Sequence, residues 1–151
     1  MRREAALELT NAVMTTADAF LRESQRLFRP FGLTAAQYNI LNVLAPKTTG
    51  MSQRELSDYL VVDRSNVTGL LDRMEKAGWV QRADDPADRR IYRVTLTAAG
   101  RSLWRKVEPR YHAVVEEVTR GVTSKRMTEC IALLDQLAQS AAKWQLPDVP
   151  P

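Results

Sequence analysis

Between residues 63 and 78, hydrophobic positions recur at intervals of three or four, which is the spacing of one face of an α-helix. These apolar positions are Val67, Leu70, Leu71, Met74 and Ala77. Polar side chains fill the positions between them, and Gly78 follows the last apolar residue, where a helix C-cap is expected. The pattern predicts an amphipathic helix over Asp63–Ala77 with one buried face and one polar face.

The residues after this helix predict a β-hairpin. Trp79 and Val80, and then Tyr92–Leu96, have the composition of strands. Between them, residues 84–88 are rich in turn formers, and Pro86 suits the second position of a type I turn. A polar-faced helix followed by a hairpin is the plan of a winged helix-turn-helix.

Two shorter helices are predicted before residue 63, and each opens with a capping box. Thr34 and Gln37 form the first box, and Ser52 and Glu55 form the second. The buried positions of these two helices are predicted to be Ile40, Leu41, Leu44, Leu56 and Leu60. Residues 61–63 then supply the turn into the third helix and, at Asp63, its N-cap, which completes the three helices of a helix-turn-helix.

Long amphipathic helices are predicted at both ends of the chain. One covers residues 4–28 and stops before Pro30; another begins at the N-cap Thr97 and is kinked at Pro109; the last covers Ser124–Trp144. Their apolar stripes exceed what the small head can cover, and a two-fold dimer is the commonest way to bury such stripes. The alternative is a monomer in which these helices fold back on their own head. We predict the dimer, because paired heads match a palindromic site.

The predicted fold is mainly α-helical with one small β-hairpin. A winged helix-turn-helix at residues 31–100 is flanked by dimerisation helices at residues 1–30 and 101–146, and residues 147–151 form a flexible, proline-rich tail. Composition adds limits to this picture: 44% of the 151 residues are hydrophobic and 26% are charged, as in ordinary globular proteins. The chain has no apolar run long enough for a transmembrane helix, and acidic residues interrupt its start where a secretory signal needs an apolar core. The single cysteine, Cys130, excludes an internal disulfide and fits a reducing cytosol, so we expect a cytoplasmic protein without a membrane partner.

The net charge of +4 permits nucleic-acid binding but does not require it. Residues 63–93 hold seven Lys or Arg and six Asp or Glu, so their balance is nearly neutral. Any preference for DNA must therefore come from where individual cations lie. Arg82, Arg89, Arg90 and Arg93 fall within twelve positions of the hairpin segment. An arginine at such a tip is favoured in a narrow minor groove, and the alternative is a solvated turn with ordinary ion pairs.

One segment resembles the signature of a known family. Asp88–Gly100, with the sequence DRRIYRVTLTAAG, matches the Asp-x-Arg … Val-x-Leu-Thr-x-x-Gly pattern of the MarR (multiple antibiotic resistance regulator) family, and Asp63–Gly78 is similar to that family's recognition helix. The resemblance implies a bacterial transcription factor that dimerises through its terminal helices and binds a pseudo-palindromic operator in double-stranded DNA. It also implies repression by occlusion of the operator, with release when a small ligand binds. The wing arginine that enters the minor groove is, by this resemblance, Arg90 or Arg89, and Asp88 braces it.

The polar face of the recognition helix supplies the other candidates for base and phosphate contact. The full set of predicted DNA-contacting residues is Arg64, Ser65, Asn66, Thr68, Gly69, Arg73, Asp88, Arg89 and Arg90. Gly69 costs about 1 kcal/mol of helix propensity relative to Ala. Close approach of the backbone to DNA is one reason for it, and a tolerated surface glycine is the other. The acidic residues Asp63, Asp72 and Glu75 are expected to brace arginines or to face away from phosphates.

By the same resemblance, a small aromatic or phenolic effector would bind between the head and the dimer helices. Its predicted lining residues are Phe20, Phe28, Phe31, Tyr38, Trp104 and Tyr111, and the alternative is that these aromatics form the core. Cys130 lies on an apolar stripe and is predicted to be packed in the core, with redox sensing as the alternative. His112 has no ligand cluster around it, and no catalytic triad or phosphate loop is present, so we expect no metal, no cofactor and no enzyme. The alternative function is a winged-helix dimer that acts as a protein-interaction scaffold, which salt-dependent binding of duplex DNA would distinguish.

Overall fold

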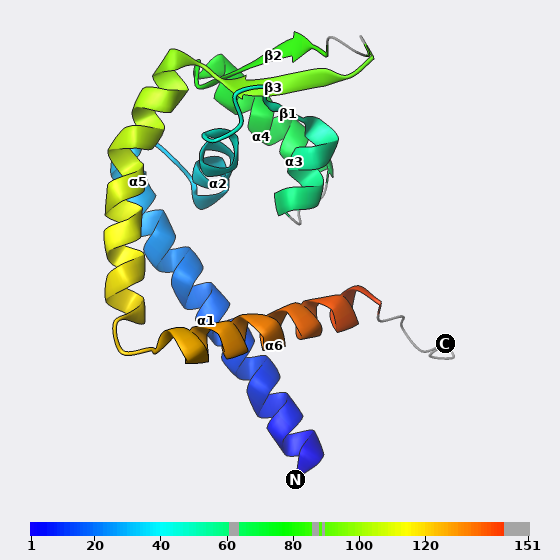
Figure 1. The fold of residues 1–151 in the computed structure, drawn as a ribbon, viewed down its shortest axis with the longest axis vertical. Helices are drawn as coiled ribbons and strands as arrows, with labels where there is room; N and C mark the ends of the chain where they lie inside the picture. The colour runs from blue at the N-terminus through cyan, green and yellow to red at the C-terminus, as the bar shows by residue number, and fades with distance from the viewer. Residues whose placement is uncertain (61–63, 86–87, 89, 144–151) are drawn as a thin grey trace. The chain divides into compact units, whose positions relative to one another are not determined.

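The computed structural model describes residues 1–60, 64–85, 88 and 90–143, and for Arg64 and Ser65 the backbone alone (Figure 1). In chain order the elements are α1 (Arg2–Phe28), a 3₁₀ turn η1 (Arg29–Phe31), α2 (Ala35–Leu44), β1 (Met51–Ser52), α3 (Gln53–Leu60), α4 (Arg64–Lys76), β2 (Val80–Asp84), β3 (Tyr92–Leu96), α5 (Ala98–Thr119) and α6 (Ser124–Ala142). The described part is mainly helical with one small sheet, which confirms the predicted fold class. It divides into two compact units, residues 1–111 and residues from 112 onward.

Both predicted capping boxes are present at the helices of the head. At the start of α2, the Thr34 hydroxyl accepts from the Gln37 N–H at 3.2 Å, and the Gln37 side chain accepts from the Thr34 N–H at 2.9 Å. At the start of α3, the Glu55 carboxylate accepts from the Ser52 N–H at 2.6 Å, and the Ser52 hydroxyl accepts from the Glu55 N–H at 3.2 Å. Each box satisfies two backbone donors that the first helical turn leaves unpaired.

The core of the head lies where α2, α3 and α4 meet the sheet. The side chains that it buries almost completely include Ile40, Leu41, Leu44, Leu56, Val67, Leu71, Met74 and Val94. Leu60 is half-buried rather than buried. Ala77 is exposed, contrary to the prediction, because α4 ends at Lys76 and Ala77 already belongs to the turn.

Gly78 ends α4 as the sequence predicts. Its φ of +73° lies in the left-handed region, which L-residues with a Cβ rarely adopt. The Gly78 N–H donates to the Glu75 carbonyl and the Trp79 N–H donates to the Met74 carbonyl, both at 2.9 Å. This pair of bonds is a Schellman motif, which caps the helix and turns the chain into the hairpin.

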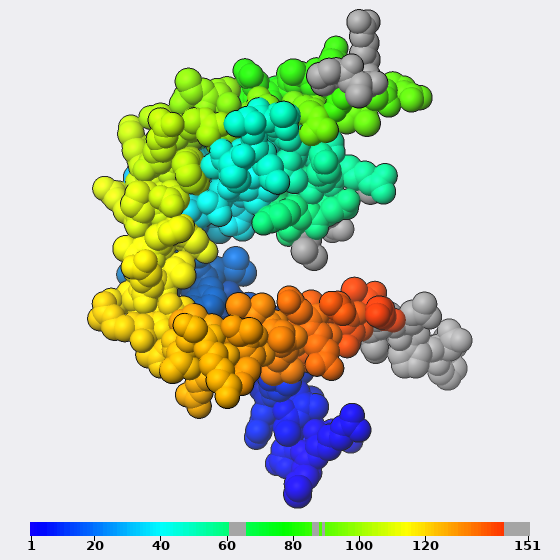
Figure 2. All heavy atoms as spheres, in the orientation of Figure 1, coloured from blue at the N-terminus to red at the C-terminus, as the bar shows by residue number. Residues whose placement is uncertain are grey.

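The sheet is antiparallel with the strand order β1-β3-β2. Strand β3 has the predicted bounds, whereas β2 begins at Val80 and runs to Asp84, so Trp79 is outside it and Asp84 is inside it rather than in the turn. Strand β1 is an addition that the sequence pattern did not predict. The predicted turns at residues 61–63 and at Pro86 lie outside the described residues. The hairpin of β2 and β3 extends past the helices of the head (Figure 1, Figure 2).

The junction between the hairpin and α5 depends on a close approach at Gly100. A Cβ at this position would lie 1.9 Å from the Trp79 carbonyl oxygen, so only glycine fits without a shift of the backbone. Thr97 is the N-cap of α5, as predicted, because its hydroxyl accepts from the Gly100 N–H at 3.0 Å. The same hydroxyl donates to the Gly78 carbonyl at 2.6 Å, which ties α5 to the end of α4.

The long helices agree with the predicted positions but leave much apolar surface uncovered in the single chain. In the first unit, α1 ends before Pro30 as predicted, and of its residues Phe28 is buried. Helix α5 contains Pro109 in the first unit and ends at Thr119 in the second. Helix α6, in the second unit, buries none of its residues. Cys130 is exposed on α6, so its predicted core packing is wrong for the single chain.

Candidate nucleic-acid interface

Helix α4 has one apolar face and one polar face, as its spacing predicts. Val67, Leu70, Leu71 and Met74 are buried. The side chains of Asn66, Thr68 and Arg73 are exposed, and Gly69 is half-exposed between them. Arg64 and Ser65 belong to the first turn of α4, and their side chains lie outside the described part of the chain. The Thr68 hydroxyl accepts a hydrogen bond from the Gln53 side chain, which joins the start of α3 to this polar face.

Gly69 has room for a side chain within the fold. A Cβ built at this position would have the Arg73 guanidinium as its nearest neighbour, at the ordinary contact distance of 3.6 Å. The described fold therefore accommodates alanine here, although glycine lowers helix stability by about 1 kcal/mol relative to Ala. No steric demand among the described residues explains the glycine.

The acidic residues of α4 hold an arginine of the hairpin. The Arg82 guanidinium donates to Asp72 and to Glu75, each at 2.6 Å, and the Arg82 backbone N–H donates to Glu75 at 3.0 Å. The Arg82 side chain is only 20% exposed. This arrangement confirms that Asp72 and Glu75 brace an arginine, and it fastens β2 to α4.

At the hairpin tip, Asp88 holds Arg90. The Arg90 guanidinium donates to the two carboxylate oxygens of Asp88 at 3.1 and 3.2 Å, and the Arg90 backbone N–H donates at 3.0 Å. These bonds lower the pKa of the Asp88 carboxyl; the bonds from the guanidinium have the larger effect and the backbone bond the smaller one. The Arg90 side chain is 90% exposed, so the predicted ion pair is present while most of the cation faces solvent. Arg89, the other candidate for the wing arginine, lies outside the described residues.

Arg93 lies on β3, close to the tip end of the hairpin, and its side chain is held within the fold. Its guanidinium donates to Asp85 at 2.6 Å and to the Gly50 carbonyl at 3.1 Å, and it lies 3.8 Å from the Glu55 carboxylate. Asp85 is buried, with 8% of its surface exposed. Sequence reasoning placed Arg82, Arg90 and Arg93 in one group, but the structure gives only Arg90 an outward position among these three.

Comparison with known proteins places the head among transcription regulators. A profile of the MarR family matches residues 31–91. The transcriptional activatory protein BadR of Rhodopseudomonas palustris is 36% identical over 138 residues, which cover 87% of this chain and 79% of that protein. This chain belongs to the MarR family.

Two further relatives of this MarR-family chain extend the comparison. The homoprotocatechuate degradative operon repressor of Escherichia coli is 25% identical over 128 residues, which cover 85% of this chain and 86% of the repressor. The crystal structure of the M. tuberculosis transcriptional regulator MOSR in complex with DNA has a TM-score of 0.72 and 31% identity, and the match covers 87% of this chain and 96% of that one. These homologues are transcription regulators rather than enzymes, which agrees with the expectation from the sequence.

The six aromatic residues predicted to line an effector pocket are not one cluster in this MarR-family chain. Phe28 stacks on Tyr38 with ring centroids 4.4 Å apart. The centroid of the Tyr111 ring lies 5.9 Å from that of Phe28 and 4.9 Å from that of Tyr38. The Phe31 ring instead lies under the Arg110 guanidinium, the Trp104 indole N–H donates to the Asn42 side chain, and Phe20 is 54% exposed. Three of the six therefore form a packed stack, and the proposed ligand site stays a prediction.

Tyr38 has an unusual environment within that stack. It is 1% exposed, and its hydroxyl has no hydrogen-bond partner among the described residues. Burial, followed by the proximity of Tyr111 and Glu108, raises the pKa of the Tyr38 phenol. The head therefore holds a buried phenol hydroxyl that no described residue satisfies.

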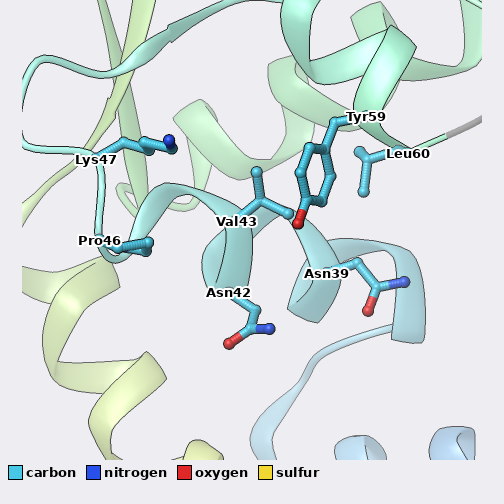
Figure 3. Close-up of a pocket in the computed structure, with 7 residues that line it drawn as sticks. All are labelled: Asn39, Asn42, Val43, Pro46, Lys47, Tyr59 and Leu60. Atoms are coloured by element: carbon cyan, nitrogen blue, oxygen red, sulfur yellow. The ribbon is translucent and has the colours of Figure 1, made fainter. Parts of the chain in front are cut away.

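Two hollows open on the head in places that sequence reasoning did not identify. One, of about 460 Å³, lies between α2 and α3 (Figure 3); its lining residues are Asn39, Asn42, Val43, Pro46, Lys47, Tyr59 and Leu60. The other, of about 360 Å³, reaches α4; its lining residues are Thr34, Ala36, Asn39, Leu60, Asn66, Leu70 and Arg73. None of the six predicted aromatic residues lines either hollow. These hollows form between elements, so no local spacing in the sequence indicates them.

No group of three or more His, Cys, Asp or Glu residues in the described part of the chain is arranged to hold a metal ion. The helices that the structure describes are also too short or too polar to cross a membrane.

Proposed function

We propose that this protein binds duplex DNA as a homodimer and represses transcription by occluding an operator. The observation that carries this proposal is the arrangement of cations around α4: Arg82 and Arg93 are held by carboxylates along the strands of the hairpin, while Arg90 is exposed at its tip. In this proposal α4 enters the major groove and the tip enters the flanking minor groove. A narrow minor groove concentrates negative potential, which favours an arginine supplied from a turn.

The polar face of α4 has the chemistry that major-groove recognition needs. The Asn66 amide matches the donor and acceptor pair of adenine, and the Arg73 guanidinium matches either guanine or a phosphate. Arg64 and Ser65 belong to the first turn, and the N-terminal residues of a recognition helix are those that contact base edges. The half-exposed Gly69 would then allow the α4 backbone to approach the DNA closely.

Dimerisation is proposed from the uncovered apolar residues of the long helices. In the first unit, α1 exposes Leu7, Met14, Phe20 and Leu21. In the second unit, the exposed apolar residues include Val114, Val118, Ile131 and Leu134. Soluble monomers rarely expose large apolar patches, and a two-fold dimer can cover such helix faces with the same faces of a second copy. Residues 1–30 and 101–146 are therefore proposed as the dimerisation region.

Selection of bound duplexes from a random pool tests the function and the symmetry together. The expected result is a palindrome whose half-sites are centred about one helical turn, roughly 34 Å, apart. Affinity for this duplex should fall as salt rises, because bound phosphates release counterions. A pool that shows no enriched sequence, with no salt-dependent binding, would contradict the proposal and favour a scaffold that acts through protein contacts alone.

A small aromatic effector and a cytoplasmic location complete the proposal. One relative is the repressor of a homoprotocatechuate degradative operon and another is a transcriptional activatory protein, so the relatives include both repressors and activators. A reporter gene placed behind the selected operator measures the sign here, and repression predicts higher expression when the protein is absent. Phenolic acids can then be screened by thermal shift and by release of the operator. A complete lack of response to the screened compounds would count against an aromatic effector.

A further inference from the structure

A continuous series of polar contacts joins the start of α3 to the exposed arginine of the hairpin tip. The Glu55 carboxylate lies 3.8 Å from the Arg93 guanidinium, and Arg93 donates to Asp85 at 2.6 Å. The other carboxylate oxygen of Asp85 accepts from the Asp88 N–H at 3.3 Å, and Asp88 holds Arg90 by two bonds from its guanidinium. The series therefore passes from a helix cap, through a buried carboxylate, to a solvent-exposed cation.

Backbone bonds close the hairpin around the same residues. The Asp85 N–H donates to the Ile91 carbonyl at 2.8 Å, and the Ile91 N–H donates to the Asp88 carbonyl at 2.9 Å. Asp85 thus joins the two sides of the tip through its backbone, and it contacts both Asp88 and Arg93 through its side chain. Among the described residues, Asp85 links the two sides of the hairpin end, and Arg93 places a cation beside its carboxylate, which offsets the cost of burying that charge.

Two acceptors hold the Arg93 guanidinium in place. Besides Asp85, its guanidinium bonds the Gly50 carbonyl at 3.1 Å, next to β1. Gly50 has a φ of +72°, and a Cβ there would lie 2.4 Å from the Val94 carbonyl oxygen, so this loop is pressed against β3. The planar guanidinium reaches both acceptors at once, which a lysine ammonium on a single flexible stem does less well.

We propose that Arg93 and Asp85 are positioning residues for Arg90, and that they orient the minor-groove contact without touching DNA. This inference rests on the proposed DNA-binding function. An exposed arginine loses side-chain freedom when it binds, and a brace that already restricts it reduces that loss. Asp88 supplies the brace, and Asp85 with Arg93 sets where Asp88 lies. Removal of Arg93 should therefore act only through Arg90.

A double-mutant cycle on the selected operator tests this dependence. Arg90→Ala should weaken binding about ten-fold or more. Arg93→Gln should weaken it about five-fold, and Arg93→Lys, which retains the charge, should fall between Arg93→Gln and wild type. The decisive expectation is that Arg93→Gln weakens the Arg90→Ala protein by no more than about two-fold. In hydroxyl-radical footprinting, the Arg90→Ala and Arg93→Gln proteins should no longer protect the flanking minor grooves of the operator. Both proteins should still protect guanines in the major groove from methylation.

Two further variants guard against a general loss of fold. Asp85→Asn keeps an oxygen to accept from the Asp88 N–H but removes the charge that Arg93 neutralises, and it should reproduce the effect of Arg93→Gln. Arg101→Gln is the matched control, because Arg101 also uses a half-buried guanidinium to bond a distant carbonyl, that of Ala45, at 2.9 Å. Arg101→Gln should bind the operator within about two-fold of wild type.

Each other outcome has a definite meaning. Equal losses from Arg93→Gln in the wild-type and Arg90→Ala backgrounds would overturn the inference, because Arg93 would then act on DNA or on the whole head. So would wild-type affinity in both Arg93→Gln and Asp85→Asn. If the Arg90→Ala protein binds the operator as tightly as wild type, Arg90 does not make the proposed minor-groove contact, and the inference about Arg93 and Asp85 is also overturned.

Discussion

At the residue scale, the arginines of the hairpin differ in what surrounds their charge. Arg82 and Arg93 donate to carboxylates at short distance and are largely covered, so their charges are already compensated within the chain. Arg90 has one carboxylate on one side and solvent on the other. A cation placed in this way retains donors for a phosphate or for a base edge, whereas a cation bound by two carboxylates has few left.

The first prediction concerns the outward arginine. Arg90→Ala should weaken operator binding by about 1–3 kcal/mol and should reduce the slope of log affinity against log salt by about one, because one cation fewer meets the DNA. Fluorescence anisotropy over a salt series measures both quantities. Arg120→Ala is a suitable control, because Arg120 is exposed and paired with Glu117 in the second unit. An Arg90→Ala protein with unchanged affinity and slope would refute the assignment.

The second prediction concerns Gly69 on the polar face of α4. Gly69→Ala should stabilise the free protein by up to about 1 kcal/mol, because alanine is the better helix former and its Cβ meets nothing closer than 3.6 Å. It should also weaken operator binding, because the added methyl group holds the DNA away from the backbone. Chemical denaturation measures the first effect and anisotropy the second. If Gly69→Ala bound as tightly as wild type, the residue would be an ordinary surface glycine.

At the element scale, features that depend on neighbours in the chain could be predicted from the sequence, and features that depend on distant residues could not. The capping boxes at Thr34 and Ser52 lie within one turn of their helices, so their pattern is legible in the sequence, and both are present. Strand β1 is only two residues long and is held by Val94 and Arg93, more than forty positions away, so no local pattern marks it. The length of β2 was likewise underestimated because pairing with β3, rather than composition, extends it to Asp84.

The same division explains the predicted site. The polar face of α4 follows from helical spacing alone, and the Asp88–Arg90 pair follows from the family signature. The roles of Arg82 and Arg93 depend on partners in other elements, Asp72 on α4 and Asp85 across the hairpin, so their grouping with Arg90 was too coarse. A usable signal was present for Arg93, which lies within the predicted strand Tyr92–Leu96, whereas the strand position of Arg82 follows from the pairing of β2 with β3.

A third prediction tests the junction between the hairpin and α5. Gly100→Ala should destabilise the protein by about 1–3 kcal/mol, because the added Cβ would lie 1.9 Å from the Trp79 carbonyl oxygen. Gly121→Ala is the matched control, since a Cβ at that position has no atom within 4 Å and should be tolerated. Thermal and chemical unfolding of the two variants give the comparison. Equal stability would show that the backbone at Trp79 yields easily.

A fourth prediction follows from the α3 capping box. Bonds from the Ser52 N–H and then the Ser52 hydroxyl lower the pKa of the Glu55 carboxyl below its ordinary 4.5. The stability that this carboxylate contributes is therefore present above pH 4.5 and is lost as the pH falls through the lowered value. Glu55→Gln should accordingly lose less stability than wild type on acidification over that window. Urea unfolding at a series of pH values tests this, and parallel profiles for the two proteins would contradict it.

At the scale of the whole molecule, the positions of the long helices were predictable and the burial of their side chains was not. Helical spacing locates α5 and α6 well, because it depends on neighbours within one turn. Burial depends on what lies against the helix, and α6 has no buried residues in the single chain. The prediction that Cys130 would be packed in the core failed for this reason. The exposed apolar stripe that contains it is the physical basis for the proposed dimer.

A fifth prediction therefore tests the dimer through α6. Ile131 is 59% exposed in the single chain, and in the proposed dimer it is covered by the partner. Ile131→Glu should shift the mass measured by sedimentation from two chains to one, because burying an unpaired carboxylate costs several kcal/mol. Gln136→Glu adds the same charge on the opposite side of α6, which is also exposed, and should leave the dimer intact. Loss of the second copy should also weaken binding to a two-half-site operator far more than binding to one half-site, since the second contact becomes effectively intramolecular only in the dimer. A dimeric Ile131→Glu protein with full operator affinity would exclude this face of α6 from the interface.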